Sequence, residues 1–202
     1  MILKINSQNP EPEKIAQVVE VLKNGGIIVY PTDTIYGLGC DIFNKKAVAK
    51  IYQLKKREQN KPMSIICAEL KEIAKYALIS DYAFQIFKKT LPGPYTFILK
   101  AKSQTPKTVL SKNRTVGIRI PDNQICLEIV KKLGNPIITT SLNISGEEVL
   151  TNPSQLSKEI TNKLDLIIDA GIMPQEPSTI VDLSANSPVI LRSGKGPLTL
   201  FK

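Results

Sequence analysis

The 202-residue sequence predicts an α/β fold with a mixed β-sheet, and three observations carry this prediction. Short apolar runs typical of buried strands alternate with segments whose apolar residues recur at helical spacing. No helical segment separates the last predicted strands, so part of the sheet should be antiparallel. The chain has no internal repeat and no linker, and its length suits one domain, so residues 1–202 are predicted to form a single domain.

The first half of the chain contains five predicted elements. In order, they are a short strand at 1–5, a helix at 13–24 closed by Gly25-Gly26, a buried strand at 27–30, a helix at 44–54 and a strand at 63–67. Asn44 is the expected N-cap of the second helix. Lys55 and Arg57 therefore fall at its C-terminal end, just before a loop.

The second half continues the alternation and then ends in strands. The predicted elements are a helix at 80–89, strands at 95–100 and 116–120, a helix at 123–133, a strand at 136–140, a helix at 153–160 and strands at 166–169, 179–183 and 189–191. A Pro92-Gly93-Pro94 turn precedes the first of these strands. The best loop candidates are residues 173–177 and 146–152.

The composition indicates a globular protein of the cytoplasm. Hydrophobic residues make up 42% and charged residues 22% of the chain, both ordinary for a globular protein. No apolar run approaches the roughly 18 residues of a membrane span, and residues 1–5 do not resemble a signal peptide, so no membrane contact is expected. Cys40, Cys67 and Cys126 are odd in number and widely spaced, which predicts reduced, buried thiols rather than disulfides or a metal site.

The charge balance points towards anionic ligands without choosing one. Twenty-seven Lys and Arg against 18 Asp and Glu give a net charge of +9. Such an excess favours nucleic acid, nucleotides or an anionic membrane. A solvated, lysine-rich surface explains the same number, so charge alone leaves both interpretations open.

Several common chemistries are excluded by residues that the chain lacks. There is no histidine, which removes Ser-His-Asp and Cys-His catalysis and the His-containing zinc motifs. Gly194-Lys195 is followed by Gly196, not by Ser or Thr, so there is no Walker loop. Gly37-Leu38-Gly39 begins a dinucleotide fingerprint but meets Ile42 where the third glycine belongs.

A hydroxyl-rich turn follows the strand predicted at 27–30. Its sequence is PTDTIYGLG, residues 31–39, and it stands where a buried strand of an α/β sheet opens into a ligand cleft. Hydroxyl groups there can hydrogen-bond a polar substrate, while glycines let the backbone approach closely. A tight turn with capping threonines is the structural alternative.

A cluster of cations follows the helix at 44–54. Lys55, Lys56, Arg57 and Lys61 bring like charges into one loop, where they can neutralise phosphate oxygens. The alternative is a solvated lysine cluster at a helix C-terminus, where the helix dipole already favours cations.

Polar side chains alternate after the strand at 136–140. Thr139, Ser141, Asn143 and Ser145 share one face of an extended segment, which suggests hydrogen bonding in a cleft, although a capping run before the helix at 153 is the alternative.

Arg119 lies in a β-rich run. Its planar guanidinium is suited to bind a carboxylate, or else to pair with Asp122 in a structural salt bridge.

Seven segments together resemble the YrdC/TsaC family of threonylcarbamoyl-AMP synthases in order and spacing. They are PTDTIYGLG, KxR followed by KPM, GPYTFIL, TVGIRIPD, TTSLNISG, PSTIVDL and ILRSGKG, and they run from Pro31 to Gly196. The resemblance implies a YrdC-like twisted mixed sheet with flanking helices around a basic cavity. It implies synthesis of threonylcarbamoyl-AMP and pyrophosphate from L-threonine, bicarbonate or CO2, and ATP with Mg2+, for hand-over to the tRNA threonylcarbamoyl transferase machinery.

The resemblance also implies site residues. Lys55, Arg57, Ser141 and Asn143 match the family's signature tetrad; Arg57, Lys61, Thr115, Ser141 and Arg192 are the implied ATP contacts, and Thr34, Arg119 and Thr139 the implied threonine contacts. Two departures stand out. Residues 64–67 lack a histidine that some members carry, and Glu147-Glu148 replaces a turn of small residues and proline.

Two other functions are compatible with the sequence. One is a double-stranded RNA or tRNA-binding protein, which the charge of +9 supports. The other is a YciO-like paralogue of the same fold with altered activity. That group tends to lose the Lys and Asn of the tetrad, which this chain retains as Lys55 and Asn143.

Overall fold

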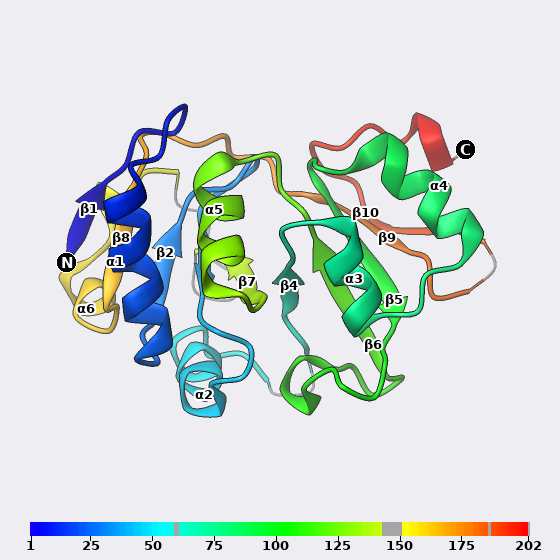
Figure 1. The fold of residues 1–202 in the computed structure, drawn as a ribbon, viewed down its shortest axis with the longest axis horizontal. Coiled ribbons are helices and arrows are strands. Elements are labelled where there is room, and N and C mark those ends of the chain that lie inside the picture. The colour runs from blue at the N-terminus through cyan, green and yellow to red at the C-terminus, as the bar shows by residue number, and fades with distance from the viewer. Residues whose placement is uncertain (59–60, 143–150, 186, 202) are drawn as a thin grey trace.

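The structure is a computed structural model and describes residues 1–58, 61–142, 151–185 and 187–201. Within these ranges ten strands form one sheet in the order β1-β8-β2-β3-β7-β4-β6-β5-β9-β10 (Figure 1). The strands are β1 (Ile2–Lys4), β2 (Ile28–Tyr30), β3 (Gly37–Gly39), β4 (Ser64–Ile66), β5 (Tyr95–Lys100), β6 (Thr115–Arg119), β7 (Ile137–Ser141), β8 (Leu166–Asp169), β9 (Thr179–Asp182) and β10 (Val189–Arg192).

The sheet contains both kinds of strand pair. The pairs β1–β8, β2–β8, β4–β6 and β5–β9 are parallel, whereas β2–β3, β3–β7, β4–β7, β5–β6 and β9–β10 are antiparallel. The predicted mixed sheet is therefore confirmed. β7 lies near the middle of the order, so its C-terminal residues face segments from both halves of the sheet.

Helices flank the sheet on both of its faces. They are α1 (Pro12–Lys23), α2 (Lys45–Leu54), α3 (Leu70–Tyr76), α4 (Asp81–Thr90), α5 (Gln124–Leu133) and α6 (Lys158–Thr161), with short 3-10 turns η1 (Lys107–Val109), η2 (Pro153–Gln155) and η3 (Thr199–Phe201). The expected N-cap of α2 forms, because the side chain of Asn44 accepts a hydrogen bond from the backbone N–H of Ala47. Ser80 and Asn123 cap α4 and α5 in the same way.

Two buried clusters fix the helices to the sheet. In Figure 1, α1 and α5 lie side by side over the half of the sheet that contains β2 and β8, and Val18 and Ile129 belong to one buried cluster with Ile168. In the other half, the ring of Phe87 on α4 lies 5.0 Å from that of Phe97 on β5. Alternate residues of a strand point to opposite faces, so Thr96 and Ile98 point away from α4. That second face of β5 carries the cavity described below.

Three sequence predictions differ from the structure. α3 was not predicted, because seven residues give too little periodicity to register. β3 was read as part of a turn because two of its three residues are glycine, yet it pairs with both β2 and β7. The helix predicted at 153–160 is two short pieces, because Leu156 adopts an extended backbone and Ser157 starts a new helix as N-cap.

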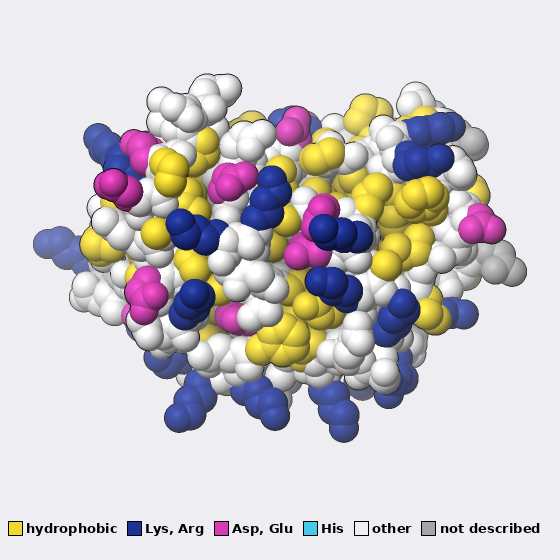
Figure 2. All heavy atoms as spheres, in the orientation of Figure 1, with side chains coloured by type: hydrophobic (Ala, Val, Ile, Leu, Met, Phe, Trp, Pro, Cys, Tyr) yellow, Lys and Arg dark blue, Asp and Glu magenta, His cyan; other side chains and the backbone are white. Residues whose placement is uncertain are grey.

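The structure shows where the three cysteines and the basic side chains lie. Cys40, Cys67 and Cys126 are buried and unpaired with one another. Lysine and arginine side chains are spread over the visible face, and several project from the edge below α2 (Figure 2). In the described part of the chain, no helix combines the length and the apolar character needed to cross a membrane.

Candidate active site

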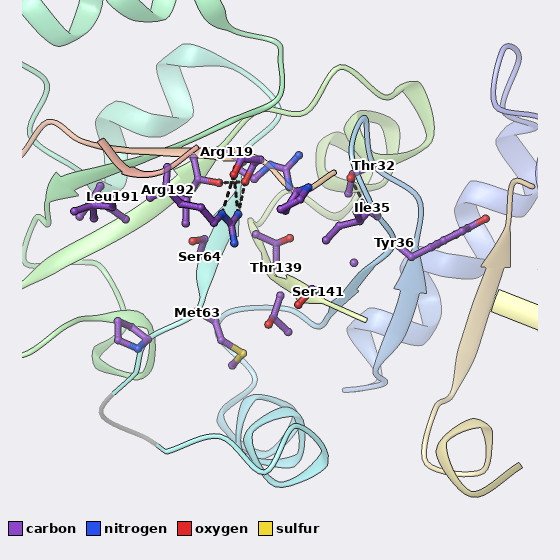
Figure 3. A pocket seen from close by; sticks show the side chains of 18 of the residues that line it. Thr32, Ile35, Tyr36, Met63, Ser64, Arg119, Thr139, Ser141, Leu191 and Arg192 are labelled. Atoms are coloured by element: carbon purple, nitrogen blue, oxygen red, sulfur yellow. Dashed lines mark hydrogen bonds between the residues drawn. The ribbon is translucent and has the colours of Figure 1, made fainter. Parts of the chain in front are cut away.

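A cavity of about 450 Å3 is lined by residues of β3, β4, β5, β6, β7, β9 and β10 and of the turn that follows β2. Hydroxyl and guanidinium groups from several strands converge on it, among apolar side chains such as Met63 and Leu191 (Figure 3). Among the residues that line the cavity are Thr32, Arg57, Ser64, Thr96, Ile98, Arg119, Thr139, Ser141, Ser178, Leu191 and Arg192. A concave site with few, convergent polar groups is the usual form of a small-molecule site.

Arg119 is the most buried of the arginines that line the cavity. It ends β6 with only 5% of its surface exposed. Its Nη2 donates to Oδ1 of Asp33 at 2.6 Å and to Oγ1 of Thr34 at 3.1 Å. The ion pair with Asp122, given as the alternative, is wrong: the partner is Asp33, 86 residues away, because the turn after β2 lies against the C-terminal end of β6.

The PTDT turn holds itself together by its own hydroxyl groups. Thr32 Oγ1 donates to the carbonyl of Ile35 at 2.6 Å and lies 3.0 Å from Oγ1 of Thr34. Thr32 lines the cavity, whereas Thr34 is fully buried beside Arg119. The turn therefore has the structural role given as the alternative, and it also presents polar groups to the cavity.

Lys55 lies beneath the cavity rather than on its wall. It is the C-cap of α2, its side chain is almost fully buried at 2% exposure, and its Nζ donates to the carbonyl of Ser141 at 2.7 Å. Burial, with the positive charge of Arg57 as a second cause, lowers the Lys55 pKa from 10.5 to about 8. The solvated lysine cluster is therefore wrong for Lys55.

The backbone conformation at Lys56 lets the side chains of Lys55 and Arg57 point in different directions. Lys56 adopts φ +48, a left-handed conformation that commonly ends a helix. Arg57 then lines the cavity, and its guanidinium donates to the carbonyls of Lys61 and Pro62 at 2.7 and 3.0 Å. These bonds tie Arg57 to the residues just before β4.

Arg192 approaches the cavity from the opposite side, from the edge strand β10. Its Nε and Nη2 donate to the carbonyl of Ser178 at 3.1 and 2.8 Å, and Ser178 Oγ in turn lies 2.9 Å from Oγ1 of Thr96. Partial burial, and secondly the charge of Arg119, lower the Arg192 pKa. Two guanidinium groups that repel each other across one cavity favour an anion between them.

Thr139 and Ser141, two positions of the period-two pattern, line the cavity from β7 (Figure 3), and Thr140 between them lines it as well. Asn143 and Ser145, the next two positions of the pattern, lie outside the described residues, as does the Glu147-Glu148 departure. The structure thus brings together Arg57, Arg119, Thr139, Ser141 and Arg192, with Thr34 and Lys55 immediately behind them.

Two predicted contacts lie away from this group. Thr115 is at the opposite end of β6, about 13 Å from Arg119 along the strand, and its Oγ1 bonds Ser111 at 2.7 Å. Lys61 is 64% exposed and its Nζ lies 3.5 Å from Glu58. Neither side chain lines the cavity in this structure.

Sequence reasoning did not assign four residues that shape the site. Asp33 and Ser178 stood inside the quoted segments PTDTIYGLG and PSTIVDL, but only the folded chain shows their arginine partners. Thr96 is buried and faces Ser178. Ser64 lines the cavity on the strand where some YrdC/TsaC members carry histidine, and a Cβ on Gly117 would collide with its Oγ.

Comparison with family models matches residues 20–194 to the Sua5/yciO/yrdC model, whose description is "Telomere recombination". The match covers most of the chain and the strands that build the cavity. The chain belongs to the Sua5/YciO/YrdC family. The resemblance drawn from the seven sequence segments is confirmed at this level.

Two relatives of the family are similar over almost the whole chain. The Methanocaldococcus jannaschii protein named "Putative threonylcarbamoyl-AMP synthase" is 42% identical over 202 residues, covering 98% of this chain and 94% of the relative. The Escherichia coli K12 "Uncharacterized protein YciO" is 36% identical over 199 residues, covering 98% and 97%.

Solved structures of the family share the fold. The crystal structure of E. coli YciO has a TM-score of 0.95 at 35% identity and covers 100% of this chain and 99% of that chain. The crystal structure of P. abyssi Sua5 complexed with L-threonine has a TM-score of 0.92 at 30% identity, over 98% of this chain and 58% of that chain. The YrdC-like α/β fold is therefore confirmed.

Proposed function

We propose that this Sua5/YciO/YrdC protein is an L-threonylcarbamoyladenylate synthase, a nucleotidyltransferase that acts in tRNA N6-threonylcarbamoyladenosine modification. The observation that carries the proposal is the pair of tethered guanidinium groups, Arg119 and Arg192, on one hydroxyl-lined cavity. The reaction must hold an amino-acid carboxylate and a triphosphate in one place. The Sua5 structure with L-threonine and the M. jannaschii relative support the same reading.

The amino-acid end is assigned to the Arg119 side of the cavity. Arg119 binds the carboxylate of L-threonine through a charge-assisted hydrogen bond. Thr139 and the PTDT turn, with Thr34 behind it, supply neutral hydrogen-bonding groups beside Arg119. Neutral donors and acceptors suit a substrate whose own hydroxyl and amine need partners.

The nucleotide end is assigned to Arg57, Ser141 and Arg192. Lys55 supplies positive charge from behind Ser141, and Asn143 is retained in this set from the family tetrad. Lys61 and Thr115 are left out of the set because their side chains point elsewhere. Mg2+ is proposed to enter with ATP and to be held mainly by phosphate oxygens, as is usual for this ion.

The proposed reaction forms two bonds in sequence. The neutral amine of threonine attacks the carbon of CO2, supplied as such or from bicarbonate, and loses a proton to give a carbamate. A carbamate oxygen then attacks the α-phosphorus of ATP, and the bond to the β-phosphate breaks to release pyrophosphate. No protein nucleophile is needed; the residues align two anionic reactants and neutralise phosphate charge.

Pyrophosphate release from ATP tests the proposal. We expect release that depends on both L-threonine and bicarbonate, and a product of the mass of threonylcarbamoyl-AMP. Lys55→Ala should abolish it, whereas Lys131→Ala, which removes a lysine that is 55% exposed, should not. Release that is independent of threonine, or full activity in Lys55→Ala, would contradict the assignment.

The similarity to YciO along the whole chain favours one further candidate, a YciO-like paralogue with an altered reaction. The same assay separates the two functions when it is run across several amino acids with and without bicarbonate.

RNA binding is another candidate function, favoured by the net charge of +9 and the lysines below α2 in Figure 2. Filter binding of tRNA with and without ATP tests it.

A further inference from the structure

The Asp33–Arg119 ion pair is buried but incompletely bonded. Both side chains are 7% exposed, and one contact, Oδ1 to Nη2 at 2.6 Å, joins them. Oδ2 of Asp33 and Nε of Arg119 are buried and have no hydrogen-bond partner among the described residues. A pair built for stability alone would satisfy these atoms, because buried unpaired polar groups are costly.

The bonds of Arg119 determine which of its nitrogens can meet a ligand. Nη2 has two hydrogens, and it donates to two acceptors, Asp33 and Thr34. Nε is enclosed. Because Arg119 lines the cavity, Nη1 is the nitrogen left to face it. Asp33 therefore fixes the guanidinium at Nη2 and leaves Nη1 to a ligand.

The glycine-lysine-glycine segment after β10 fixes Asp33 in turn. Lys195 Nζ donates to the carbonyl of Asp33 at 2.6 Å, and the Lys195 backbone N–H donates to the carbonyl of Pro177 at 2.9 Å. A Cβ on Gly194 would stand 2.7 Å from the carbonyl carbon of Ser178, so only glycine lets this segment lie so close to the start of β9. The segment does not match a Walker loop, but it holds the backbone of Asp33 next to the start of β9.

We propose that Asp33 is a positioning residue for the amino-acid substrate: it holds Arg119 so that Nη1 meets the substrate carboxylate, and Lys195 holds Asp33. This inference rests on the proposed function, since it takes an amino acid as the ligand of Arg119. Electrostatics alone predicts that the negative charge of Asp33 weakens, rather than supports, binding of the substrate carboxylate. A negative charge beside the cavity weakens the binding of anions, so neutralising it should tighten binding unless orientation matters more.

Asp33→Asn separates orientation from charge, and Asp122→Asn is the matched control. Asp122 is exposed and lies three residues after Arg119 in the sequence. We expect Asp33→Asn to raise the KM for L-threonine about tenfold, to change kcat at saturating threonine less than about threefold, and to leave the KM for ATP within about twofold. Direct binding of L-threonine, measured calorimetrically, should weaken in parallel, and Asp122→Asn should match the wild type.

An unchanged or lowered threonine KM in Asp33→Asn overturns the inference. If that variant loses cooperative thermal unfolding, Lys195→Met carries the test, because Lys195 is exposed and its loss should raise the threonine KM about threefold without changing that of ATP. An unchanged threonine KM there overturns the inference as well. A wild type that neither binds threonine nor releases pyrophosphate refutes the proposed function, and this inference with it; an active wild type matched by Asp33→Asn refutes this inference alone.

Discussion

Lys55 allows a test of the site that does not depend on activity. Its side chain is 2% exposed, and its pKa falls from 10.5 to about 8, chiefly through burial. Below pH 8 the amine is charged in both folded and unfolded chains, and the penalty for burying the charge is present in full. Between pH 8 and 10.5 the unfolded chain binds more protons than the folded chain, so the free energy of unfolding rises with pH. Above 10.5 the penalty is gone.

The size of this effect follows from the gap between the two pKa values. A gap of about 2.5 units at about 1.36 kcal/mol per unit gives about 3 kcal/mol. Other groups titrate in the same range, so the quantity to measure is the difference in unfolding free energy between wild type and Lys55→Met. We expect this difference to shift by about 3 kcal/mol in favour of the wild type from pH 7 to pH 10.5.

Urea unfolding followed by far-UV circular dichroism measures this difference at each pH. Lys131→Met is the control, because that lysine is 55% exposed and its difference from the wild type should stay constant. A Lys55→Met difference that stays within about 0.5 kcal/mol across the whole range would show that the amine is not buried as a charge. The basis for placing it behind the nucleotide end would then be lost.

Four further predictions concern single positions. Lys56→Gly should raise the unfolding free energy by about 0.5 kcal/mol, measured in urea, because glycine accepts φ +48 without strain. Gly39→Ala should lower it by about 2 kcal/mol, because the added Cβ would collide with the carbonyl of Ile138 and lie 2.8 Å from the Tyr30 ring. Arg192→Met should raise the KM for ATP about tenfold through loss of a charged contact; an unchanged value would remove Arg192 from the nucleotide end. The buried thiols, with the Cys40 pKa raised to about 12 by burial, should not react with Ellman's reagent at pH 8 until urea unfolds the chain.

The order of the main elements could be predicted from sequence because local signals agree with the fold. α2 is the clearest case: Asn44 caps it, its apolar residues face one side, and Lys55 follows it as predicted. β3 and α3 escaped prediction for the opposite reason. Their structure depends on partners distant in sequence, such as Ser141 opposite Gly37, and three or seven residues hold too little pattern of their own.

Some residues of the site could be predicted from local sequence, whereas their partners from distant segments could not. Arg119 and Arg192 could be singled out by residue type and by the family pattern, but not the acceptors that orient them, Asp33 and Ser178. The Asp33 pair spans 86 residues, and no periodicity in either segment encodes it. Asp122, three residues from Arg119, was the natural guess from sequence alone. The folded position of the turn after β2, beside the end of β6, decides which carboxylate reaches the guanidinium, and sequence distance does not.

The arginines of the cavity cannot by themselves choose the amino acid. Every α-amino acid has the carboxylate that Arg119 would hold, and every nucleoside triphosphate has the phosphates that Arg192 would meet. Discrimination must come from the neutral part of the wall, where Thr139 and Ser64 lie close to the arginines (Figure 3). A wall of this kind rejects a substrate lacking a hydroxyl more strongly than one lacking a methyl group, because an unpaired buried hydroxyl costs more than a small cavity. Selectivity for threonine over valine should therefore exceed selectivity for threonine over serine, wherever Arg119 holds the carboxylate.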